Sequence, residues 1–214
     1  MRRCVDVMLA GAWYNIRESR MENFVIKGQD IVVLASLMGG EAWNAYAELG
    51  KRARLSVSET HAAVKRLMAS GLVNSDRRLV RRNVMEFLVH GLRYMFPFKA
   101  AGRLARGMPT AYAAPVAEGE FVSTGLVPVW SCEGGTVSGQ AFEPIYATAP
   151  LAAGQDAGVY DRLALFDMLR GGRLRERNFA ERKLREILFC MRRWRKSSAS
   201  TCNPRKSRMP STGL

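Results

Sequence analysis

The 214-residue chain contains few cysteines and histidines and no long apolar run. Its four cysteines are scattered without a C-x-x-C pair, and neither of its two histidines lies at metal-ligand spacing. We therefore expect no disulfide framework and no metal site, and a reducing cytoplasm suits such a chain. No window approaches the roughly 18 consecutive apolar residues of a membrane span, and Asp6 interrupts the short apolar stretch near the start. The sequence thus predicts a soluble, cytoplasmic protein without an export signal.

Motifs of the common enzyme classes are also missing. The chain has no H-E-x-x-H motif, no P-loop lysine motif and no G-x-G-x-x-G motif. Ser138 lies one position away from the place that the G-x-S-x-G elbow of hydrolases requires between Gly135 and Gly139. Asp161 and Asp167 share a predicted helix but are six residues apart, so their carboxylates do not converge on a substrate. We therefore predict no catalytic activity and no cofactor.

Positive charge, in contrast, is in large excess. Thirty-three lysine and arginine residues against nineteen acidic residues give a formal net charge of +14. Residues 192–214 hold seven basic residues and no acidic one, and their composition predicts a disordered tail. The rest of the chain still carries half of the excess charge. This balance favours a polyanionic partner, with nucleic acid ahead of an anionic membrane surface.

Three amphipathic helices are predicted between residues 28 and 71. The first begins near Asp30, the second covers roughly residues 43–52, and the third ends at Gly71. The third helix opens at Ser56, which has the S-x-x-E spacing of a capping box with Glu59. Its apolar positions, which we expect in the core, are Thr60, Ala63, Val64 and Leu67.

A hairpin and a fourth helix are predicted next. Two short extended segments flank residues 75–78, which indicates a hairpin with a basic tip. Asn83 and Glu86 repeat the capping spacing, so we expect them to open a helix that Pro97 closes. Helix, helix, capped helix and basic hairpin give residues 28–82 the order of elements of a winged helix-turn-helix.

The second half of the chain differs in composition. Residues 98–156 are rich in proline, glycine and alanine, so we expect mostly loop, with one β-hairpin that pairs residues 126–130 with 136–139. The aromatic side chains of this segment suit a small satellite core better than a stacking platform. Helical periodicity returns with a break at Gly171-Gly172, which predicts a helical hairpin whose apolar faces mediate dimerisation. The expected organisation is an extension (1–24), a winged helix-turn-helix (25–97), the Pro/Gly-rich segment (98–156), the helical hairpin (157–191) and the basic tail (192–214).

Residues 55–73, L-S-V-S-E-T-H-A-A-V-K-R-L-M-A-S-G-L-V, resemble the recognition-helix segment of bacterial winged-helix transcription regulators, especially the MarR-like kind. In that family "leu-ser-x-ser" opens the helix, and "lys-arg-leu-x-x-x-gly-leu-val" leads into the wing. The likeness extends over about residues 28–95. It implies a mainly α fold with a small β wing (α+β class) and a repressor that binds double-stranded DNA as a homodimer. The segment after residue 97 departs from the all-helical dimerisation region of MarR proteins.

The predicted DNA-binding residues belong to the third helix and the hairpin tip. A major groove accepts one α-helix whose exposed residues are short or polar enough to reach base edges. The resemblance implies that Lys65 contacts a phosphate or a guanine edge, and that the hairpin tip enters the minor groove or clamps its phosphates. The full predicted set is Ser56, Ser58, Glu59, His61, Ala62, Lys65, Arg66, Arg77 and Arg78.

Two other functions stay open at this point. A winged-helix protein can be an adaptor, for example an antitoxin-like member of a two-protein system that binds its partner through residues 98–150. The same basic surface can also bind structured RNA. An ordinary solvated face explains the basic residues of the predicted set equally well.

Overall fold

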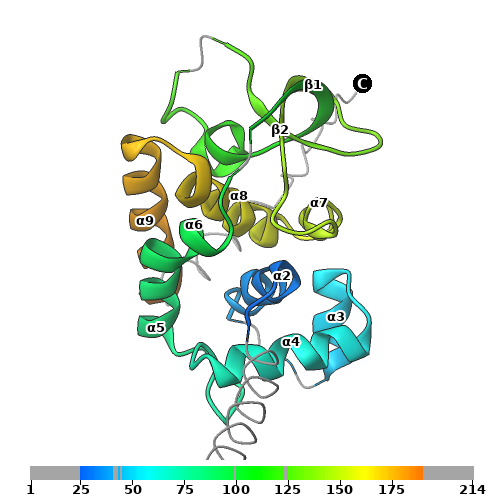
Figure 1. Ribbon diagram of the computed structural model, residues 1–214, viewed down its shortest axis with the longest axis vertical. Helices are drawn as coiled ribbons and strands as arrows, with labels where there is room; N and C mark the ends of the chain where they lie inside the picture. The colour runs from blue at the N-terminus through cyan, green and yellow to red at the C-terminus, as the bar shows by residue number, and fades with distance from the viewer. Residues whose placement is uncertain (1–24, 41–42, 44, 99, 123–124, 190–214) are drawn as a thin grey trace, which may run out of the picture.

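The computed structural model describes residues 25–40, 43, 45–98, 100–122 and 125–189 (Figure 1). The predicted N-terminal extension and the basic tail from residue 192 lie outside these residues. Within the described part, α-helices predominate over a small β-sheet, in agreement with the predicted mixture of α and β structure. None of the described helices has both the length and the apolar character needed to cross a bilayer.

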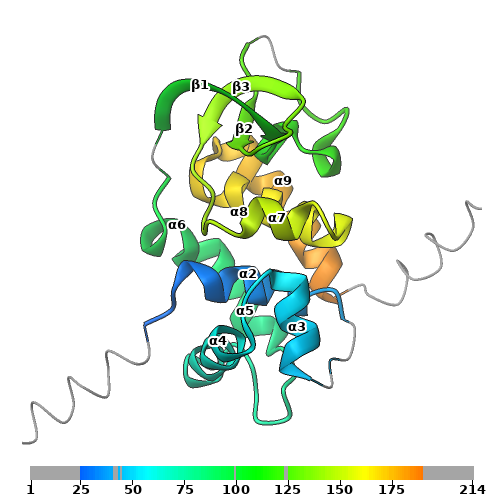
Figure 2. The ribbon, with the colours of Figure 1, turned by 90° about the vertical axis from the view of Figure 1, so that its right-hand side faces the viewer.

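Three consecutive helices confirm the predicted succession in the first half of the chain. They are α2 (Gly28–Leu37), α3 (Tyr46–Ala53) and α4 (Val57–Ala69). Every side chain of α2 from Asp30 to Leu37 is buried, because this helix packs against α3, α4 and the later helix α8 (Ala157–Gly171). Figure 2 shows α2 in this middle position, with α3 and α4 below it and α8 above it.

The N-terminus of α4 has the capping box that the sequence predicts. The Ser56 hydroxyl accepts a hydrogen bond from the Glu59 N–H (3.2 Å), and the Glu59 carboxylate accepts one from the Ser56 N–H (3.0 Å). These bonds satisfy N–H groups that a helix end otherwise leaves open, so they fix the residue at which α4 begins. The predicted core positions of α4 are all buried: Thr60, Ala63, Val64 and Leu67.

A tight hairpin follows α4. Its extended part is a single antiparallel bridge between Val73 and Leu79. The chain turns at Arg77, whose φ of 59° lies in the left-handed region, and the Asn74 side chain accepts a hydrogen bond from the Arg78 N–H (2.8 Å). The predicted hairpin with a basic tip is thus present, in a form shorter than a two-stranded sheet.

The next helix begins earlier than predicted. It runs from Arg81 as α5 (Arg81–Glu86), a π-helical turn (Phe87–Gly91) and α6 (Leu92–Met95). The prediction of a cap at Asn83 is wrong, because the Asn83 side chain donates a hydrogen bond to the Gly71 carbonyl (2.9 Å). Asn83 therefore ties this helix to the end of α4. The helix ends before Pro97, as expected.

The Pro/Gly-rich segment contains a three-stranded closed barrel instead of one hairpin. Its strands are β1 (Ala100–Pro109), β2 (Pro128–Ser131) and β3 (Val137–Phe142). β1 pairs antiparallel with both other strands, whereas β2 and β3 are parallel, with Val129 opposite Ala141. The predicted antiparallel pairing of β2 with β3 is therefore wrong. The backbone approaches Gly107 of β1 so closely, at Trp130, that a side chain there would clash.

The last three helices are α7 (Ala149–Ala153), α8 and α9 (Leu174–Phe189), and the predicted break at Gly171-Gly172 separates α8 from α9. α8 is buried along most of its length and contacts α2, α6, α7 and α9. The apolar residues of α9 are buried as well: Phe179, Ala180, Leu184 and Leu188. The apolar faces on which the prediction of dimerisation rests thus contribute to the core of one chain.

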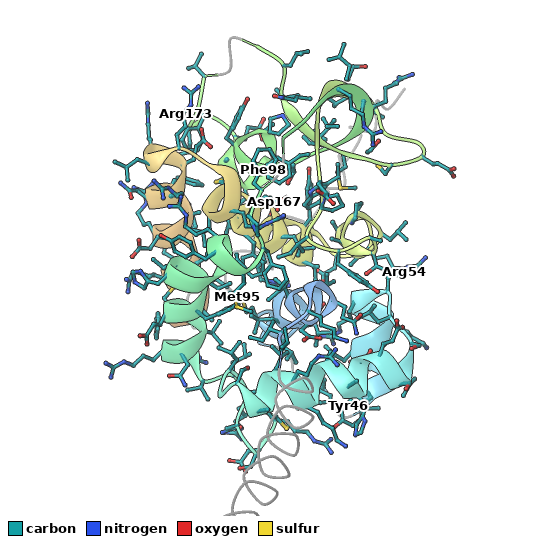
Figure 3. The ribbon with its side chains drawn as sticks, in the orientation of Figure 1. Tyr46, Arg54, Met95, Phe98, Asp167 and Arg173 are labelled. Carbon is teal, nitrogen blue, oxygen red and sulfur yellow. The ribbon has the colours of Figure 1, made fainter. Side chains whose placement is uncertain are left out.

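A buried carboxylate joins α8 to the barrel. Asp167 accepts hydrogen bonds from the Thr110 hydroxyl (2.9 Å) and the Trp130 indole N–H (2.7 Å), and it forms an ion pair with Arg170 (2.7 Å). Burial raises the pKa of Asp167 to about 6, although these three partners act in the opposite direction. Figure 3 shows Asp167 between α8 and the strands. One continuous hydrophobic cluster, from Ile26 to Leu188, spans the described part of the chain.

Candidate nucleic-acid interface

One side of α4 stays exposed in this fold. The buried side packs on α2 and α3, and the helix lies at the end of the molecule remote from the β-strands (Figure 1). Ser58, His61 and Lys65 recur on the exposed side at three- and four-residue spacing, and Ala62 beside them is half-buried. We call these four residues the α4 face. In Figure 2 the hairpin projects beyond α4 at the same end of the molecule.

Arg66 does not belong to this exposed side. Its Nε and Nη2 atoms donate hydrogen bonds of 2.8 Å and 2.6 Å to the two carboxylate oxygens of Asp30. The Arg66 side chain is 11% exposed and that of Asp30 is completely buried, and this hydrogen bonding raises the pKa of Arg66. Asp30 also accepts the Lys27 N–H (2.8 Å) at the start of α2. We therefore remove Arg66 from the predicted DNA contacts, because its guanidinium holds α4 against α2.

Ser56 and Glu59 are exposed, but their side chains bond to each other. The Ser56 hydroxyl donates to the Glu59 carboxylate (2.7 Å) in addition to the two bonds of the capping box. These hydrogen bonds from Ser56 hold the pKa of the Glu59 carboxyl below its ordinary value. Both residues thus define the beginning of α4, and a carboxylate that stays ionised does not favour phosphate at this position.

The hairpin tip folds back onto aromatic rings. The Arg77 guanidinium lies over the rings of Trp43 (5.4 Å from the centroid) and Tyr46 (5.2 Å). Tyr46 meets the His61 ring edge to face at 4.9 Å. This aromatic cluster of Trp43, Tyr46, His61 and Arg77 connects the hairpin to α3 and α4. Arg77 and Arg78 are both exposed, and the Arg77 guanidinium packs on the cluster.

Sequence reasoning missed two features of this end of the molecule. It predicted no contact between the second helix and the hairpin, although Trp43 and Tyr46 form the aromatic cluster with Arg77. It also omitted Arg81 and Arg82, which are exposed at the start of α5, immediately after the hairpin. Their position in the sequence, directly after the basic tip, could have identified them. Residues 45–82 contain nine basic and three acidic residues, so this end of the molecule is strongly positive.

No protein-family model matches the chain, and no curated protein or solved structure matches it either. The resemblance of residues 55–73 to MarR-like regulators therefore stays a prediction. In the part of the chain that the structure describes, no group of three or more histidine, cysteine, aspartate or glutamate side chains is arranged to hold a metal ion.

Proposed function

We propose that the protein binds duplex DNA through a winged helix-turn-helix formed by α2, α3, α4 and the hairpin, and that it represses transcription by occupying promoter DNA. The observation that carries this proposal is the α4 face. Its side chains are short or polar, and the opposite side of the helix is fixed by a buried core and by the ion pair of Asp30 with Arg66. Such a helix fits a major groove without rearrangement.

The charges around α4 support the same partner. In this proposal Ser58, His61 and Lys65 face base edges, while Arg78 contacts phosphates beside the groove. Arg81 and Arg82 add positive charge next to the hairpin. Since each phosphate contact releases counterions, binding should weaken steeply as the salt concentration rises. A homodimer, for which the sequence suggested the helical hairpin, stays a prediction.

The test is binding of the full chain to the duplex upstream of its own gene and to a scrambled duplex, across a salt series. A second chain that ends at residue 191 separates the contribution of the basic tail. We expect both chains to prefer the native duplex at physiological salt. Equal binding to the two duplexes, lost with the tail, would overturn the proposal.

Two further experiments test the alternative functions. Structured RNA that displaces the native duplex at equal concentration would favour an RNA-binding protein. Isolation from the host after nuclease treatment tests the adaptor hypothesis. A stoichiometric protein partner that survives this treatment, without specific DNA binding, would favour the adaptor.

A further inference from the structure

The aromatic cluster is the point at which the two elements of the candidate interface meet. The Arg77 guanidinium lies over the rings of Trp43 and Tyr46, and these two rings meet edge to face at 5.2 Å. The Tyr46 ring also contacts His61 of the α4 face. Figure 3 shows Tyr46 at the end of the molecule that contains α4. One ring at the start of α3 thus contacts both the hairpin and the exposed side of α4.

The base of the hairpin is anchored in the core, whereas its tip is exposed. Val73 at the base is 2% exposed, and residues 75–78 are all exposed. Within the tip, the Asn74 carbonyl accepts the Arg77 N–H (3.0 Å), and the Asn74 side chain accepts the Arg78 N–H (2.8 Å). These bonds close the tip on itself, so a contact of the Arg77 side chain with α3 fixes the position of the tip as a whole.

The backbone conformation of Arg77 supports a role for its side chain. Its φ of 59° lies in the left-handed region, which glycine and asparagine adopt more readily than arginine. Such conformations persist where the surroundings enforce them, and they are frequent at functional sites. Here the contact with two rings offsets the unfavourable backbone, because a guanidinium is attracted to the faces of aromatic rings.

We propose that Tyr46 and Trp43 position the hairpin on DNA by holding the Arg77 guanidinium, so that the neighbouring Arg78 meets the phosphates. This inference rests on the proposed DNA binding and deepens it, because it assigns a role to residues that touch no DNA in the proposed complex. A hairpin that is already in place loses less conformational freedom on binding, which favours affinity. Removal of the Tyr46 ring should therefore weaken a contact that another residue makes.

Amide hydrogen exchange of the full chain without DNA tests whether the cluster holds the hairpin. Tyr46→Leu keeps an apolar side chain but removes the ring. It should raise the exchange rates of the Arg77 and Arg78 N–H groups about threefold, the factor that corresponds to loss of one exposed cation–π contact. Tyr46→Phe keeps the ring and should leave these rates unchanged.

Tyr94→Leu is the matched control for the exchange experiment. The Arg93 guanidinium lies over the Tyr94 ring at 5.3 Å, so this change removes a similar contact from α6, outside the candidate interface. It should leave the exchange of the hairpin unchanged. Unchanged hairpin exchange in Tyr46→Leu, or an equal rise in Tyr94→Leu, would overturn the proposal.

Binding of the full chain to the scrambled duplex across a salt series tests the effect on phosphate contact. Tyr46→Leu removes no charge, yet it should weaken binding at physiological salt by up to about threefold and make the salt slope shallower, because the Arg78 contact is made less often. A general loss of fold stability would not change this slope. Tyr46→Phe and Tyr94→Leu should match the parent chain. In a chain that also carries Arg78→Ala, Tyr46→Leu should have no further effect.

Failure of this inference differs from failure of the proposed function. A parent chain that binds both duplexes equally, and only through the basic tail, would overturn the proposed DNA binding and this inference with it. A parent chain that prefers the native duplex, with the same salt slope in Tyr46→Leu as in Tyr46→Phe, would overturn this inference alone. Additive effects of Tyr46→Leu and Arg78→Ala would overturn it as well, because Tyr46 would then act without Arg78.

Discussion

Asp30 is a completely buried carboxylate whose charge is balanced by a single guanidinium, that of Arg66. Taking a charge out of water is unfavourable by several kcal/mol unless a partner compensates it. Sequence reasoning placed Arg66 on an exposed side of its helix, because arginine is rarely buried and its partner lies 36 residues away in the chain. The partner of a buried charge is set by how helices pack, which local patterns do not reveal.

Replacement of Arg66 by methionine should therefore destabilise the fold. The change keeps an unbranched apolar chain in place of the aliphatic part of arginine but leaves Asp30 buried without its counter-charge, so we expect the free energy of unfolding to fall by about 3 kcal/mol. Urea unfolding measures this loss. Lys65→Met, at the exposed neighbouring position, should change it by less than about 0.5 kcal/mol. Equal effects of the two changes would mean that the ion pair does not stabilise the packing of α4 on α2.

Asp167 should make stability depend on pH. Burial raises its pKa from an ordinary value of 3.8 to about 6, so between these values the folded chain holds a proton that the unfolded chain has lost. Asp167 therefore favours folding most at pH values below the lower pKa, and this contribution is lost as the pH rises through about 6.

The comparison with Asp167→Asn isolates this effect. The free energy of unfolding of the parent chain minus that of the variant should fall by about 2 kcal/mol as the pH rises from 4 to 7, and then level off. Urea unfolding at a series of pH values measures the difference. Asp76→Asn, at the exposed hairpin, is the control. A difference that rises with pH would mean that the ion pair with Arg170 outweighs the desolvation of the carboxylate.

At the scale of helices and strands, α4 and the hairpin have separable roles in the proposed complex. Alanine at Ser58, His61 and Lys65 together should relax sequence preference, because each well-formed base contact is worth about 1–3 kcal/mol of discrimination. Arg78→Ala should instead weaken binding to all duplexes alike and reduce the salt slope by about 1. Competition binding with native and scrambled duplexes distinguishes these outcomes.

Arg106→Ala provides the control for charge alone, since this exposed arginine lies on β1, in the half of the molecule away from α4. If it had the same effect as Arg78→Ala, binding would depend on net charge rather than on the hairpin. If the triple variant kept its sequence preference, α4 would not read the bases.

The elements that were predicted correctly carry their signals locally. Ser56 and Glu59 are three residues apart, and the buried positions of α4 follow the helical period, so both the start and the core side of this helix could be predicted. The strand β1 has no such signal, because its sequence A-A-G-R-L-A-R-G-M-P lacks β-branched and aromatic residues. Its extended form depends on β2 and β3, which lie beyond it in the chain. The parallel pairing of those two strands was missed for the same reason, since β1 lies against both.

At the scale of the whole molecule, α8 connects the two halves. It contacts α2 and α6 of the first half, and α7 and the short helical turns Ala111–Ala113 and Pro115–Ala117 of the second half. Fully buried residues of α8 include Phe166 and Met168, and they belong to the same hydrophobic cluster as α2. A helix that is apolar nearly all round, such as α2, needs neighbours on all sides.

Residues 25–97 should therefore not fold alone, although the sequence predicts them as one domain. Without α8, the side of α2 that packs on it would be exposed to water, although this helix is buried from Asp30 to Leu37 in the complete chain. We expect this fragment to lack a cooperative thermal transition in circular dichroism. Residues 25–189 should instead unfold in one transition. A cooperative transition of the fragment alone would show that the first half has a sufficient core of its own.

The π-helical turn between α5 and α6 has a consequence for changes in the gene. The turn holds one more residue than a regular helical segment, and removal of one codon would restore the regular helix without a shift of reading frame. The same deletion would rotate everything after it by about 100°, because an α-helix has about 3.6 residues per turn. Leu92, fully buried on the helix that packs on α8, would then point elsewhere. A one-residue deletion that the helix alone would tolerate is therefore incompatible with the packed core. We expect the number of codons in this turn to be preserved among descendants of the gene.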